Sequence, residues 1–60
     1  MESRVQVNGN ELPVSLEFGQ ERGRWSMPEQ LPESYFPLTA HAEGRRFELY
    51  SDGTFSEVEL

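Results

Sequence analysis

The chain has 60 residues and a formal net charge of −6 at pH 7, and its 35% hydrophobic content suffices for a small core. This length predicts one domain, residues 1–60, whose marginal core calls for a supplement. The absence of cysteine excludes disulfides and thiolate zinc sites, and one histidine excludes a histidine-based metal cluster. We therefore expect no metal and no cofactor, and association with another chain becomes the expected supplement.

The charge also bears on partners and location. Direct nucleic-acid binding is disfavoured, because affinity for phosphate comes from clustered Lys and Arg and this chain has five Arg and no Lys. No apolar run approaches the ~20 residues of a membrane-spanning helix. The start of the sequence, MESRVQV, lacks the apolar region of a signal peptide. We expect a cytoplasmic protein that does not enter a membrane.

The first predicted element is a β-hairpin. Asn8-Gly9 is a strong turn signal, because both residues tolerate the positive φ of a type I′ turn. The strand after it alternates apolar and polar positions, with its apolar face at Leu12, Val14, Leu16 and Phe18. A two-residue loop places Val5 opposite Leu12, whereas a four-residue loop over 8–11 places Val7 there. We favour the longer loop, because it pairs more of the apolar residues.

Prolines and one tryptophan characterise the middle of the chain. Pro13 cannot donate to a ladder, so its strand lies at an edge or the proline nitrogen points outward. A short strand is predicted over 24–27, with Trp25 in the core or, alternatively, an anchor of a binding surface. The proline-rich stretch that follows allows one helical turn starting at Pro28. Leu31 is expected to fold back over the core.

Residues 36–60 are predicted to form a three-stranded antiparallel meander, because two turn signals, Glu43-Gly44 and Asp52-Gly53, separate three alternating runs. With two-residue loops at both, Ala40 pairs with Phe47, and Phe47 pairs with Val58. Both loops then put the same residues on one inner face: Phe36, Leu38, Ala40, Phe47, Leu49, Val58 and Leu60.

The opposite face of the meander carries the candidate binding residues. The predicted register places Arg46 between His41 and Glu59, and it places Glu48 beside Glu57. Tyrosine is favoured at protein interfaces, so the aromatic end of this face is the expected contact surface. The predicted protein-binding residues are Tyr35, Tyr50, Phe55, Arg46, Glu48 and Glu57.

Catalysis is not expected. Two adjacent carboxylates such as Glu48 and Glu57 can serve as acid and base or bind a divalent cation, but 60 residues do not easily build the cleft that catalysis requires. The predicted neighbour of His41 is a cation, Arg46, which cannot orient it as a general base. No glycine-rich phosphate loop is present.

Together these patterns predict an all-β fold, with an N-terminal hairpin plus a three-stranded C-terminal meander, closed as an SH3-like partial barrel or stacked as two sheets. The expected function is that of a non-catalytic protein-interaction module, self-associating or a small subunit of a larger assembly, which binds through the aromatic and acidic sheet face. The alternative is an acidic antagonist that mimics nucleic acid and occupies the basic site of a partner protein through Glu43, Glu48, Asp52, Glu57 and Glu59.

Overall fold

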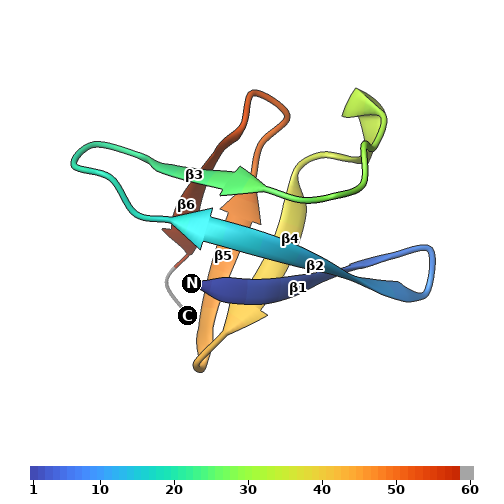
Figure 1. Ribbon diagram of the computed structural model, residues 1–60, viewed down its shortest axis with the longest axis horizontal. Coiled ribbons are helices and arrows are strands. Elements are labelled where there is room, and N and C mark those ends of the chain that lie inside the picture. Colours follow the sequence, from blue (N-terminus) through green and yellow to red (C-terminus); the bar gives the residue numbers. More distant parts are fainter. Residues whose placement is uncertain (59–60) are drawn as a thin grey trace.

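A computed structural model describes residues 1–58 and shows six antiparallel strands that close into a small barrel (Figure 1). The strands are β1 (Glu2–Val7), β2 (Asn10–Glu17), β3 (Gly23–Ser26), β4 (Leu38–Ala42), β5 (Arg45–Leu49) and β6 (Thr54–Val58). Their order around the barrel is β1-β2-β3-β6-β5-β4, and β1 pairs with β4. The all-β prediction is confirmed, and the strands form a closed barrel instead of two stacked sheets.

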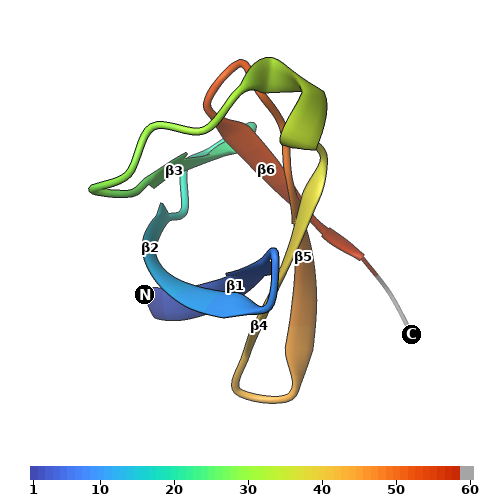
Figure 2. The same cartoon turned by 90° about the vertical axis from the view of Figure 1, so that its right-hand side faces the viewer.

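The barrel consists of two consecutive meanders, β1-β2-β3 and β4-β5-β6, which face each other in Figure 2. Two short seams join them. β1 meets β4 through Arg4 opposite His41 and Val5 opposite Ala40. β3 meets β6 through two further pairs of residues. The hairpin turns are local in sequence, whereas both seams join residues from different halves of the chain.

The core lies between the two meanders and takes buried apolar residues from β1, β2, β4, β5 and β6, whereas Trp25 of β3 is half buried. Its buried members are Val5, Val7, Val14, Leu16, Leu38, Ala40, Phe47, Leu49 and Phe55. The ring of Trp25 stacks on Phe36 with centroids 5.1 Å apart, and its indole N–H donates to the carbonyl of Tyr50 at 2.8 Å. Leu31 packs against this core, as predicted. No helix within residues 1–58 is long and apolar enough to cross a membrane.

The N-terminal hairpin has the shorter of the two predicted loops. Val5 lies opposite Leu12 and Val7 opposite Asn10, so the preference for a four-residue loop was wrong. Asn8 and Gly9 have φ values of 51° and 80°. Both values suit a type I′ turn, whose twist matches that of the strands it joins. Turn geometry therefore outweighs the number of apolar pairs.

Pro13 occupies a position of β2 where no donor is needed. Leu16 and Met1 exchange backbone hydrogen bonds. Along an antiparallel ladder, hydrogen-bonded pairs alternate with non-hydrogen-bonded pairs. Pro13 and Arg4 form a non-hydrogen-bonded pair, so the nitrogen of Pro13 points away from β1. On that other side β3 pairs only with residues 15–17. The outward nitrogen, one of the two predicted arrangements, is confirmed.

The first turn of the C-terminal meander has the predicted register. Ala40 lies opposite Phe47 and Leu38 opposite Leu49. The turn has two residues, Glu43 with φ 55° and Gly44 with φ 72°. Glutamate is strained in this left-handed region, and the turn forms there all the same.

The second turn differs from the prediction by one residue. The N–H of Tyr50 donates to the carbonyl of Thr54 at 2.8 Å, which leaves the three residues 51–53 in the loop. Gly53 has φ 92°, as in a type I turn followed by a left-handed residue. Asp52 accepts hydrogen bonds from the N–H and the hydroxyl of Thr54, at 3.0 and 2.6 Å, and so stabilises this longer loop.

The longer loop shifts the register of β6 and turns its side chains over. Phe47 lies opposite Glu57 and Leu49 opposite Phe55, so the predicted pairing of Phe47 with Val58 was wrong. Val58 is only half buried. The predictions for Glu59 and Leu60 fall outside the described residues.

The segment between β3 and β4 holds one helical turn, at a different place from the prediction. No helix starts at Pro28. The turn is a 3-10 helix, η1 (Glu33–Tyr35), in which the N–H of Phe36 donates to the carbonyl of Glu33 at 3.1 Å. Pro32, with φ −59°, precedes it and is already in a conformation compatible with a helix start.

Candidate functional site

The outer face of β1, β4, β5 and β6 is the candidate functional site, and it contains half of the predicted binding residues. Arg46 and Glu48 alternate with the buried core residues of β5, and Tyr50 follows directly after that strand. All three side chains are half buried. The parity of β5, on which the prediction depended, is therefore confirmed.

Tyr50 is held in place on this face by its neighbours. Its hydroxyl is hydrogen-bonded to the hydroxyl of Ser56 at 3.0 Å and donates weakly to Glu48 at 3.5 Å. Glu48 and Ser56 are themselves a cross-strand pair of β5 and β6. The register shift of β6 therefore supplies Tyr50 with a hydroxyl partner that the predicted register did not contain.

The predicted aromatic end does not assemble. Tyr35 lies in η1, where its hydroxyl accepts a hydrogen bond from the side-chain amide of Asn8 at 3.2 Å. Phe55 was predicted on the outer face, but it is only 4% exposed and belongs to the core. Its ring packs edge-to-face against Phe47 at 5.6 Å and Phe18 at 5.3 Å. Of the three aromatic residues, Tyr50 alone lies on the predicted face.

The predicted pair of like charges, Glu48 and Glu57, is also absent, because Ser56 takes the position opposite Glu48. Glu57 shares the inward parity of Phe55 and lies at an open end of the barrel. There it accepts two hydrogen bonds from Arg45, at 2.7 and 2.9 Å. These bonds lower the pKa of Glu57 and raise the pKa of Arg45.

The same open end exposes Phe18, which the sequence assigned to the buried face of its strand. Phe18 follows β2 and is 53% exposed, although its ring touches Phe47 with centroids 5.9 Å apart. The guanidinium of Arg45 lies 5.3 Å from the centre of the Phe18 ring and 5.2 Å from that of Phe47. Arg45 and Glu57 thus cover the aromatic core with a charged pair.

Strand β1 also contributes to the outer face, which the sequence did not predict. Arg4 lies opposite His41, and His41 lies opposite Arg46, so three basic side chains form one row across β1, β4 and β5. We call these three residues the basic row. Neighbouring strands are about 4.8 Å apart, so the row is about 10 Å long. The pair of His41 with Arg46 was predicted, whereas no local signal links Arg4 to a strand 37 positions later.

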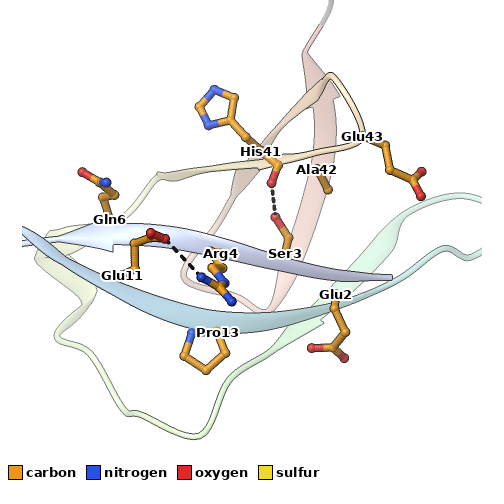
Figure 3. Close-up of a pocket in the computed structure, with 9 residues that line it drawn as sticks. All are labelled: Glu2, Ser3, Arg4, Gln6, Glu11, Pro13, His41, Ala42 and Glu43. Atoms are coloured by element: carbon orange, nitrogen blue, oxygen red, sulfur yellow. Dashed lines mark hydrogen bonds and ion pairs between the residues drawn. The ribbon is translucent and has the colours of Figure 1, made fainter.

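Two open grooves border the basic row. The larger, of about 660 Å³, runs over the outer side of β1 and is lined by Glu2, Ser3, Arg4, Gln6, Glu11, Pro13, His41, Ala42 and Glu43 (Figure 3). The second, of about 550 Å³, extends toward Pro37 and Thr39. Arg4 and His41 line both grooves. In Figure 3 the Arg4 side chain is directed toward Glu11, and the His41 ring points away from it.

The chemistry available on this surface is recognition of charged and polar groups. Within residues 1–58, no three side chains of the His, Asp and Glu types come together as a metal site would require. Both grooves are open to solvent, and the larger one has three carboxylates, Glu2, Glu11 and Glu43, in its lining. The fold and the surface together define a small closed antiparallel barrel with a charged outer sheet face. Comparison with protein-family models, with curated proteins and with solved structures finds no match to the chain.

Proposed function

We propose that this protein is a non-catalytic protein-interaction module that binds through the outer face of β1, β4, β5 and β6. The observation that carries the proposal is the fixed position of Tyr50, whose hydroxyl is bonded to Ser56 on a solvent-facing sheet. Tyrosine and arginine are the side chains that most often dominate binding energy at interfaces. A side chain that is already oriented loses less conformational entropy when a partner binds.

The partner is a protein, either a second copy of this chain or another subunit. The small core supports this, because domains of this size commonly gain stability from association. The composition of the face supports it too, since Glu48 lies between Arg46 of β5 and Tyr50, which follows that strand. Such a mixture of aromatic and charged groups is typical of interfaces between separately folded proteins.

The alternative, an acidic antagonist that mimics nucleic acid, has less support from the geometry. Glu57 is paired with Arg45 at 2.7 Å, and Asp52 is engaged by Thr54 and lies 4.0 Å from Arg22. Two of the carboxylates that this function needs are therefore already satisfied within the chain. The basic row adds positive charge to the same surface.

A matched pair of tyrosine variants tests the proposal. Tyr50→Ala removes the anchor from the outer face, and Tyr35→Ala removes an exposed tyrosine from η1. Partners captured from the native host by each immobilised variant are quantified by mass spectrometry. We expect Tyr50→Ala to weaken capture by about 30-fold, the effect of a hot-spot loss near 2 kcal/mol, and Tyr35→Ala to leave it unchanged.

Thermal unfolding of both variants provides the control, since each must remain folded for the comparison to count. Normal capture by a folded Tyr50→Ala variant would refute the proposed surface. Light scattering separates the two kinds of partner. A wild-type protein that stays monomeric at high micromolar concentration would exclude a second copy as a tight partner.

A further inference from the structure

The basic row of Arg4, His41 and Arg46 gathers three basic residues in a chain that is acidic as a whole. Arg4 and Arg46 lie on either side of His41, one on each neighbouring strand, so two guanidinium groups lie on one sheet face in a protein of net charge −6. Guanidinium groups are strong donors to carboxylates and other anionic groups. An anionic group of another molecule lying over the row would interact with both.

The ion pairs of the chain leave the row largely unneutralised. Arg45 is bound by Glu57 at 2.7 Å, but Arg4 has one 3.5 Å contact with Glu11 in which both side chains are well exposed. Among residues 1–58, no carboxylate forms an ion pair with His41 or Arg46. The row therefore retains most of its capacity to bind negative charge.

We infer that the basic row binds an acidic segment of a partner protein, a refinement that rests on the proposed function. Alternate side chains of an extended segment lie about 7 Å apart on one side. Two carboxylates at such positions fit a row about 10 Å long, because arginine side chains reach several ångströms from the backbone. The smaller groove is lined by Arg4 and His41 and has no carboxylate in its lining, so it leaves room for the main chain of that segment.

A protein segment suits this site better than a nucleic acid does. The row supplies three basic groups, whereas affinity for a phosphate backbone grows with the number of phosphates neutralised. The remaining surface of the chain is acidic and repels a long polyanion at low salt. A short acidic segment meets less of that repulsion than a long polyanion does, because it extends over fewer of the surrounding carboxylates.

The test uses a short fluorescent peptide in which glutamate alternates with threonine, and a control peptide with glutamine in place of glutamate. Affinities are measured by anisotropy at low salt for the wild type and for Arg4→Gln, Arg46→Gln and Arg24→Gln. Arg24 is an exposed residue of β3 outside the row, so its variant has the same change in net charge. Thermal unfolding verifies that each variant is folded.

We expect the glutamate peptide to bind and the glutamine peptide not to bind. Arg4→Gln and Arg46→Gln should each weaken binding about two- to fivefold, the range of exposed ion pairs, and Arg24→Gln should have a smaller effect. Equal binding of the two peptides, or equal losses in all three variants, would overturn the inference. Tighter binding of a single-stranded oligothymidylate through Arg4 and Arg46 would overturn it in favour of a nucleic acid.

The two proposals fail in distinguishable ways. If Tyr50→Ala abolishes capture of the native partner and the row variants do not affect it, the surface is correct and its acidic ligand is refuted. If none of the folded variants affects capture, both proposals fall.

Discussion

The ring of Phe55 lies so close to the α-carbon of Gly23 that no side chain fits between them. A β-carbon on Gly23 would lie 2.2 Å from Cζ and 2.3 Å from Cε2 of the ring. The two residues face each other across the seam of β3 and β6, where the barrel closes. The missing side chain on β3 therefore makes room for the aromatic residue that the register of β6 turns inward.

Gly23→Ala should destabilise the protein strongly. The Phe55 ring packs against Phe18 and Phe47, so moving it away from a new β-carbon would disturb these aromatic contacts. Overpacking of this kind costs about 1–3 kcal/mol. Denaturant unfolding of Gly23→Ala, Phe55→Leu and the double variant measures the coupling. The smaller leucine should partly rescue the alanine, and strictly additive losses would show that the contact is not the cause.

Replacing Glu43 should stabilise the protein. Glu43 has φ 55° at the first position of a two-residue turn, where asparagine is the favoured residue. Relief of this conformational strain is worth about 1 kcal/mol. Glu43→Asn should therefore raise the free energy of unfolding, and Glu43→Gln, which removes the same charge but keeps the strain, should not. Equal gains in both would point to charge instead of backbone conformation.

Ser3 is expected to stabilise the seam between β1 and β4. It is the one buried polar residue among those described, and its hydroxyl donates to the carbonyl of His41 at 2.7 Å. Ser3→Ala should cost about 1–2 kcal/mol and should speed amide hydrogen exchange at His41, which pairs with Arg4 across this seam. Ser15→Ala, which removes an exposed hydroxyl bonded to Glu2 at 2.7 Å, should cost less. The role assigned to Ser3 fails if the two variants lose the same stability.

The pair of Arg45 and Glu57 should make stability depend on acid pH. Arg45 lowers the folded pKa of Glu57 below its unfolded value of about 4.3. The carboxylate therefore stabilises the fold above that value, and this contribution is lost as pH falls through the lower folded pKa. Wild type should exceed Glu57→Gln in stability at pH 7, and the difference should shrink in acid.

The control for this titration is Glu29→Gln, at an exposed position between β3 and η1. It should follow the wild type closely across the pH range. A Glu57→Gln deficit that stays constant down to the lowest pH at which the protein folds would show that the lost contribution is packing and not ionic. Urea unfolding at a series of pH values measures both variants.

Much of the fold follows from local sequence signals. The turn signals Asn8-Gly9 and Glu43-Gly44 each form a turn with positive φ values, and the alternation in β5 places Phe47 inside and Glu48 outside. The third turn was predicted one residue too short. Asp52 and Gly53 suit a turn of two residues or of three, and the choice depends on the bonds that Asp52 makes with Thr54. One extra residue in the loop moved Phe55 from the predicted surface into the core.

By itself, the order of residues determined the strands, the hairpins and the side of β5 that faces water, because these depend on side-chain periodicity and on backbone preferences at single positions. Closure into a barrel depends on the tertiary structure, since the two seams join residues that are distant in the chain. Closure brought Arg4 beside His41 and seated Phe55 on Gly23. Contacts of this kind depend on how two halves of the chain fit together, a property that no local pattern encodes.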